Sequence, residues 1–391
     1  MTQAPTRLEI DVDYLTAQLD ALLEIPSPTG FTDTIVRYTC AELERLGLDY
    51  ALTRRGAIIA RMAGIQPDGA RSIVSHLDTL GAQVAGLKDN GRLELVPVGT
   101  WSARFAEGAR ADVFTAHGAY RGTILPPLAS GHTFGDAVDE APIGWRHLEL
   151  RVDGLAQNAE QLERLGIEIG DMVAVDPQAE FLDNGFIVSR HLDNKAGVAV
   201  MLAAIKALMA QETMAPVDIY WLFTIAEEVG QGAAAILLPG IASMVAVDNG
   251  TSAPGQNSSE FGVTIAMADQ TGPFDYHLTR KMAELCEVND IRHQKDVFRY
   301  YRSDSASAIE AGADVRTALV TFGVDASHGY ERIHMHALRS LAELLTAYCL
   351  SDVEIPRDSE ALSGLKGFTK QPTEEAEQDL TAVSEMPEEP E

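Results

Sequence analysis

Cysteine is scarce in this chain of 391 residues, which contains only Cys40, Cys286 and Cys349. The three lie far apart and form no CxxC pair, so we expect neither a disulfide framework nor a thiolate zinc site. Such cysteine usage fits a reducing compartment, and we expect a cytoplasmic protein. The first residues, MTQAPTRLEIDVD, carry acids where a signal peptide would carry basic residues followed by an apolar run.

Basic residues and long apolar runs are also few. The 30 basic residues stand against 58 acidic ones, a formal net charge of −28. That charge repels nucleic acid and anionic membranes, so we expect neither as a partner. The longest uncharged stretch, Val229–Val247, could just span a bilayer, but Pro239 and Gly240 interrupt it. It predicts a short helix followed by a buried strand.

The sequence does contain a regular alternation of strand and helix patterns. Val217–Ile225 is nearly all apolar, which is typical of a strand covered on both faces, whereas Thr34–Leu48 has apolar residues at helical spacing. The alternation predicts an α/β fold with a central mixed sheet flanked by helices. The other expected strands are Arg71–Ser75, Met244–Val247 and Thr317–Phe322, and the other expected helices are Asp193–Ala210, Ala233–Leu238, Phe274–Val288, Ser305–Ala311 and Ala337–Tyr348.

Residues 84–182 interrupt this alternation. They are rich in glycine and proline and contain short β-like pieces such as RLELVPVG and DMVAVD, which predicts a small β-rich domain inserted into the α/β domain. The α/β domain would then consist of residues 1–83 and 183–352. Residues 353–391 are expected to be an acidic, disordered tail, because eight acids, no basic residue and three prolines follow from Gln371 onward.

Histidines and carboxylates gather at five of the predicted strand ends. Ligands of open α/β sheets bind beyond the carboxyl ends of the strands, so these side chains are expected to meet. Imidazole together with carboxylate suits zinc, cobalt or manganese. Buried acids at this density would repel one another without cations. We therefore expect two divalent ions that share a bridging carboxylate, with zinc as the preferred metal. The segments concerned are Ser75–Asp78, Ser189–Asn194, Ile225–Gly230, Val245–Gly250 and Ala326–Glu331. In the second segment His191 and Asp193 form an HxD pair, and the residues alone do not decide which of the two is a ligand.

The Glu227-Glu228 pair suits a division of labour in which one carboxylate binds metal and the other acts as general base. Such a pair is ordinarily a solvated helix face. Here it follows Trp221–Ala226, six residues of which only Thr224 is polar, so burial is the better interpretation.

The ordered set of motifs resembles the M42 family of dinuclear metallo-aminopeptidases, which includes glutamyl aminopeptidases and TET-like enzymes. The similarity covers nearly the whole chain before the tail, and GIEIGDMVAVD precedes LDNKAG as in that family. The ending HGYERxH resembles a branch found beside genes for an osmoprotectant dipeptide. The motifs are HxD at His76–Asp78, LDNKAG at Leu192–Gly197, EEVG at Glu227–Gly230, the strand-end Asp248, and HGYERxH at His328–His334.

The resemblance implies two metal positions that share one aspartate. His76, Asp248 and a bridging Asp193 would hold one ion. Asp193, Glu228 and His328 would hold the other. His328 is preferred as the last ligand because it comes soon after a predicted strand and leaves room for a loop before the closing helix.

The resemblance also assigns roles around the metals. Glu227 would be the general base, and Asp78 would orient His76, since ligating histidines usually have such a partner. The Asp193–Asn194 peptide bond would be cis. His334, which lies closer to the closing helix, is the alternative to His328.

The implied function is an aminopeptidase that hydrolyses the N-terminal residues of short peptides, as a homo-oligomer built from dimers through the inserted domain, up to a dodecamer. The alternative is a metal-dependent deacylase, amidohydrolase or dipeptidase with a small specialised substrate. The family has a glycine-rich run before the residue that matches Asp304, and this chain has Arg299 and Arg302 there instead. These arginines could bind a substrate carboxylate, although pairing with surface acids is the simpler interpretation. Glycoside hydrolysis would need two carboxylates and no metal. A non-catalytic protein would be expected to have lost some of the ligands.

Overall fold

The computed structural model describes residues 7–372, and within them the centre of the fold is a nine-stranded mixed sheet. Its four middle strands run parallel, in the order β12 (Val217–Thr224), β3 (Gln66–His76), β13 (Ile241–Thr251) and β17 (Arg316–Val324). The expected α/β fold with a central mixed sheet is therefore confirmed. The outer strands are β1 (Asp49–Leu52), β2 (Ile58–Met62), β14 (Val263–Asp269), β15 (Gly272–Pro273) and β16 (His293–Val297). Their pairings are antiparallel except that of β14 with β16.

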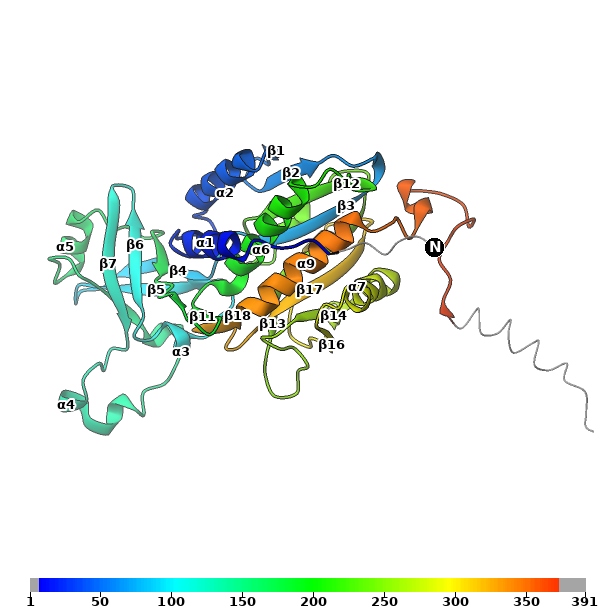
Figure 1. Cartoon of the computed structure of the whole chain (residues 1–391). Coiled ribbons are helices and arrows are strands. Elements are labelled where there is room, and N and C mark those ends of the chain that lie inside the picture. Colours follow the sequence, from blue (N-terminus) through cyan, green and yellow to red (C-terminus); the bar gives the residue numbers. More distant parts are fainter. Residues whose placement is uncertain (1–6, 373–391) are drawn as a thin grey trace, which may run out of the picture.

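The middle strand β12 is nearly all apolar because both of its faces are covered. Every residue of β12 is buried except the half-buried Tyr220. Figure 1 shows α1 (Val12–Leu23), α6 (Leu192–Met209) and α9 (Met335–Leu350) side by side along one face of the sheet. The expected helices are confirmed to within a few residues in α6, α9, α2 (Asp33–Arg45), α7 (Tyr276–Val288) and α8 (Asp304–Glu310).

The uncharged stretch Val229–Val247 forms a turn and then the start of β13. The expected helix Ala233–Leu238 is only a 3-10 turn, η3 (Gly232–Ala235). The backbone N–H of Ala233 donates to Asp304 Oδ1 at 2.8 Å, so a side chain from a distant helix caps the start of this turn. Among the described residues, no helix has the length and apolarity needed to cross a bilayer.

A closed antiparallel barrel with its own apolar core lies between β3 and β12 in the sequence, and all but its first three residues fall within 84–182, where a β-rich insertion is expected. Its first strand begins at Gly81. In Figure 1 the barrel stands beside the end of the central sheet. Its strands are β4 (Gly81–Leu87), β5 (Arg92–Val98), β6 (Arg110–Thr115), β7 (Gly118–Leu125), β8 (Glu149–Val152) and β9 (Met172–Val175), with the short helical segments α3 (Ala103–Ala106), α4 (Gly131–Phe134), η1 (Gly135–Val138), η2 (Trp145–His147) and α5 (Ala159–Arg164) between them.

A small three-stranded sheet carries the chain from the barrel back to α6. It consists of β10 (Glu180–Phe181), β11 (Phe186–Ser189) and β18 (Glu331–His334). Because β11 pairs with β18, the turn after β17 is brought to the start of α6.

The C-terminal segment beyond α9 contacts the α/β body at least as far as η4 (Pro356–Ser359), where Asp358 pairs with Arg316. Residues 373–391 of the tail predicted at 353–391 lie outside the described residues.

Candidate metal centre

The predicted histidines and carboxylates meet because of the register of the parallel strands. Ala246 of β13 lies opposite Val74 of β3, so Asp248, two residues further on, comes level with His76 at the end of β3. Asp193 is the second residue of α6 and is preceded by β11. The Asp193–Asn194 peptide bond is cis, as the family resemblance implies.

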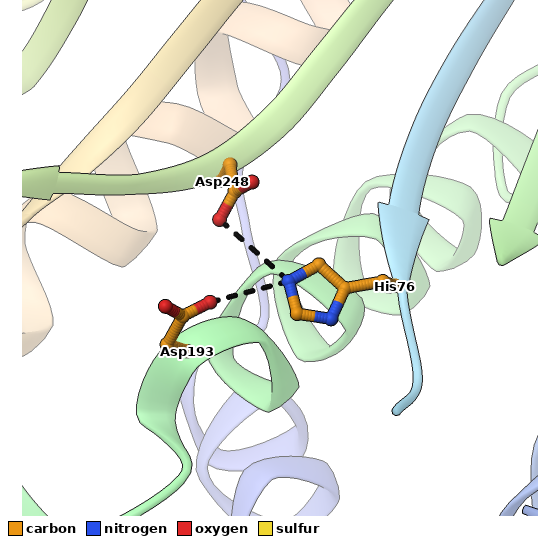
Figure 2. A group of neighbouring side chains, drawn as sticks. All are labelled: His76, Asp193 and Asp248. Carbon is orange, nitrogen blue, oxygen red and sulfur yellow. Dashed lines mark hydrogen bonds and ion pairs between the residues drawn. The ribbon is translucent and has the colours of Figure 1, made fainter. Parts of the chain in front are cut away.

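The first group of ligand atoms is formed by His76, Asp193 and Asp248, each at most 5% exposed (Figure 2). The Nε2 atom of His76 lies 3.2 Å from Asp193 Oδ1 and 3.8 Å from Asp248 Oδ1. Glu227 Oε2 is also 3.8 Å from this nitrogen. An imidazole and two carboxylates therefore converge on one point from a strand, a helix start and a second strand.

The second group is formed by Asp193, Glu228 and His328. His328 Nε2 lies 3.1 Å from Asp193 Oδ2 and 3.9 Å from Glu228 Oε2. Asp193 thus presents Oδ1 to one group and Oδ2 to the other. In each group the ligand atoms lie within 4.8 Å of one another, close enough for a single ion to contact all three.

Backbone carbonyls fix the orientation of both histidines. The Nδ1 atom of His76 lies 2.8 Å from the carbonyl oxygen of Asp78, and that of His328 lies 2.8 Å from the carbonyl oxygen of Thr100, which follows β5 of the barrel. When Nδ1 carries the proton, Nε2 keeps its lone pair for a metal. The barrel thereby supplies part of the site.

Asp78 contacts His76 mainly through its backbone. Its carboxylate is 3.6 Å from His76 Nδ1, but it accepts closer hydrogen bonds from the backbone N–H groups of Glu227 (3.1 Å) and Glu228 (3.3 Å). The hydroxyl of Thr29 also donates to it, at 2.6 Å. The Asp78 side chain therefore holds the turn that carries the two glutamates.

Burial dominates the electrostatics of the cluster. It raises the pKa of Glu227 and Glu228 well above the usual range, and it raises the pKa of Asp248 to about 7. For Asp193, burial acts in the same direction but is outweighed by hydrogen bonds from His328 and His76, which lower its pKa. Glu228 Oε1 is buried and has no hydrogen-bond partner among the described residues. The cluster is therefore a concentration of buried carboxyl groups, several of which retain their protons, with one ligand atom left open.

The structure brings all seven predicted residues together and places His334 elsewhere. His334 Nε2 lies 3.0 Å from the carbonyl oxygen of Asn184, and its ring packs against Phe186 and Phe261. It therefore contributes no atom to either ligand group.

Sequence reasoning missed several polar residues around the cluster. Asn249 donates from Nδ2 to Asp193 Oδ2 at 2.6 Å, and the buried Glu331 accepts from the backbone N–H of Asp193. In the sequence, Asn249 directly follows the predicted ligand Asp248, and Glu331 is part of HGYERxH. Only the three-dimensional contacts distinguish them from ordinary polar residues.

A hollow of about 640 Å³ opens at the cluster and is lined by Glu227, Asp304 and Tyr301. A second hollow of about 1110 Å³ adjoins it at Tyr301 and contains Arg299 in its wall. Arg302 forms two hydrogen bonds with Glu310, at 2.8 and 2.7 Å. Arg302 therefore pairs with a surface acid, as in the simpler interpretation. Of the two arginines considered for binding a substrate carboxylate, only Arg299 faces a hollow without this pairing with Glu310.

Comparisons with known sequences point to one family, and comparisons with solved structures agree on the fold. The family model described as M42 glutamyl aminopeptidase matches residues 56–344. YhfE of Bacillus subtilis, whose name gives it a provisional aminopeptidase assignment, is 36% identical over 84% of this chain and 95% of its own length. Among solved structures, the aminopeptidase APDkam598 of Desulfurococcus kamchatkensis has a TM-score of 0.79 at 23% identity, covering 90% of this chain and 99% of that one. The TET1 peptidase of Pyrococcus horikoshii, described as assembling into a tetrahedron or a large octahedral shell, has a TM-score of 0.77 at 23% identity, covering 86% and 99%.

Proposed function

The chain belongs to the M42 peptidase family, and from this premise we propose that it is a dinuclear metal-dependent aminopeptidase acting on short peptides. Membership makes it an aminopeptidase-class hydrolase of peptide bonds in a metal-dependent family. The proposal concerns the number of ions, the residues that hold them and the general base. The observation that carries it is the sharing of Asp193 between two groups of ligand atoms.

The residues present fit two divalent cations. His76, Asp193 and Asp248 would hold one ion. Asp193, Glu228 and His328 would hold the other, and the unpartnered Glu228 Oε1 is an available donor there. Mixed imidazole and carboxylate ligands suit zinc, with cobalt and manganese as alternatives. Cations would also offset the mutual repulsion of the buried acids.

Bound divalent ions would supply Lewis acidity, which lowers the pKa of water and polarises a carbonyl group. Glu227 belongs to neither ligand group and lines the hollow, so its carboxylate is available as general base. It would take a proton from the attacking water and pass it to the leaving amine nitrogen. The acidic cluster would attract the free N-terminal ammonium group of the substrate.

We also propose a homo-oligomer in which the barrel mediates dimer formation. Support comes from the fold shared with the Pyrococcus TET1 peptidase and its described shells. The dimer would be the building unit of any larger assembly, up to a dodecamer.

Free-amine substrates should be cleaved and their N-acetylated counterparts should not. We expect aminoacyl amides to be hydrolysed in the presence of zinc, cobalt or manganese, and a chelator to stop the reaction. The measurement is product formation from paired free and acetylated amides, with and without chelator. Cleavage of the acetylated series alone would indicate a deacylase, and chelator-resistant cleavage would exclude the metal mechanism.

Replacing His328 with alanine should reduce the metal content from two ions to one per chain, whereas His334→Ala should retain both. His328 offers its Nε2 to Asp193 and Glu228, while both nitrogens of His334 face the backbone. Elemental analysis of the purified variants, after dialysis against metal-free buffer, measures this difference. Equal metal content in the two variants would contradict the assignment.

A further inference from the structure

Glu331 is a fully buried carboxylate that points at backbone rather than at the proposed metal positions. It is 1% exposed. Its Oε2 accepts a hydrogen bond from the backbone N–H of Asp193 at 3.1 Å, and its Oε1 accepts one from the backbone N–H of His328 at 2.9 Å. Each carboxylate oxygen thus holds the main chain of one proposed ligand.

The position of Glu331 follows from the small sheet. It is the first residue of β18 and pairs with Ser189, the last residue of β11, just before the chain enters α6. The same residue therefore lies next to the start of α6, which carries Asp193, and next to the turn that carries His328. These two segments are far apart in the sequence and are brought together by the pairing of β11 with β18.

The turn before β18 has a strained backbone that the hydrogen bond with Glu331 helps to hold in place. Ala326 and His328 have φ angles of 59° and 64°, in the left-handed region that is unfavourable for residues other than glycine. His328 is also the least buried of the proposed ligands, with 33% of its side chain exposed. By contrast, His76 and Asp248 stand on neighbouring strands of the central sheet. The His328 side of the centre thus depends more on local hydrogen bonds than the His76 side does.

We propose that Glu331 is a positioning residue that sets the separation of Asp193 and His328, and thereby the metal affinity of the Asp193–Glu228–His328 position. This inference rests on the proposed dinuclear site. A carboxylate can accept both N–H groups at once, whereas an amide of the same shape must turn an NH₂ group toward one of them. In its ionised form, which bound cations nearby would favour, Glu331 also makes two charge-assisted hydrogen bonds that are stronger than neutral ones.

The test is a metal titration of full-length Glu331→Gln against wild type. Metal-free protein is titrated with Co²⁺ in competition with a chromophoric chelator of known affinity, and both binding steps are fitted. We expect two ions in wild type and, in the variant, about a 10–100-fold loss of affinity at one step only, the range typical for residues that orient metal ligands. Activity of the variant should recover when Co²⁺ is raised to saturation.

Asp325→Asn is the matched control, because it removes a carboxylate from the same turn at a side chain that is 54% exposed. It should leave both affinities unchanged. Unchanged affinities in Glu331→Gln, or equal losses at both steps, would overturn the positioning role. Fewer than two ions in wild type would instead overturn the proposed dinuclear site. If circular dichroism shows that Glu331→Gln is unfolded, Glu331→Asp, which keeps the charge on a shorter side chain, is titrated under the same criteria.

Discussion

Glu227→Gln should lower kcat for aminoacyl amides by about 10²–10⁴-fold while both metal ions remain bound. Glutamine has nearly the same shape as glutamate but cannot accept a proton from water. Glu227 lies outside both ligand groups, so its replacement should spare them. The measurement combines kcat and KM on a free-amine substrate with the metal content of the same preparation.

Glu228→Gln is the informative companion, because the neighbouring residue has the same chemistry but a different proposed role. Its Oε2 lies 3.9 Å from His328 Nε2 within the second ligand group. This variant should lose affinity for one ion, and part of its activity should return at high metal concentration. A Glu227→Gln enzyme with near wild-type kcat, or one that has lost its metal, would show that the two roles are assigned wrongly.

The sequence predicted those parts of the fold that depend on local patterns. Val217–Ile225 could be recognised as a buried strand because a strand covered on both faces must be apolar throughout. The α6 helix was equally clear from its composition. The exception is Ala233–Leu238, where an alanine-rich pattern favours a helix but only a 3-10 turn forms before Pro239, which disfavours helical backbone at Leu238. The Asp304 carboxylate that caps this turn comes from a distant segment and leaves no trace in the local pattern.

In the candidate site, too, some residues could be predicted from local sequence patterns and others could not. Acids and histidines at strand ends could be found because the carboxyl ends of parallel strands meet in space. The carbonyl of Thr100, which orients His328, could not be found, since a backbone atom has no sequence signal. Glu331 stood within a recognised motif, but its contact with Asp193 spans 138 positions and depends on the pairing of β11 with β18. The roles of the seven predicted residues remain predictions until the variants are measured.

Removing the metal ions should destabilise the protein, and the loss should be larger at pH 8 than at pH 5. Without cations, burial raises the pKa of Asp304 to about 6, of Asp248 to about 7 and of Glu331 to about 8. In the unfolded chain these carboxyls titrate near pH 4. Between pH 4 and the folded-state values the folded protein retains protons that the unfolded chain releases, so its stability falls as pH rises.

His328 adds to this fall of stability with rising pH. Although burial opposes it, the hydrogen bond with Asp193 raises the pKa of His328 to about 11, so the folded protein also retains this proton above about pH 6.5, where the unfolded chain loses it. Each proton retained in this way reduces the free energy of unfolding by about 1.4 kcal/mol per pH unit. Bound divalent ions would replace the protons of the proposed ligands Asp248 and His328. Their positive charge would also favour the ionised forms of the nearby Asp304 and Glu331, so metal binding should remove most of the slope.

Thermal unfolding at pH 5 and pH 8, with saturating zinc and with chelator, measures the effect. Surface repulsion in a chain of net charge −28 also weakens stability at high pH, but it acts on both preparations. The difference in Tm between the zinc-bound and chelated protein therefore isolates the cluster, and we expect it to widen from pH 5 to pH 8. If cations take the place of protons at the cluster, the advantage of the metal-bound protein must grow as protons become scarce. A Tm difference that stays constant or narrows from pH 5 to pH 8 would therefore mean that metal does not neutralise the buried carboxylates.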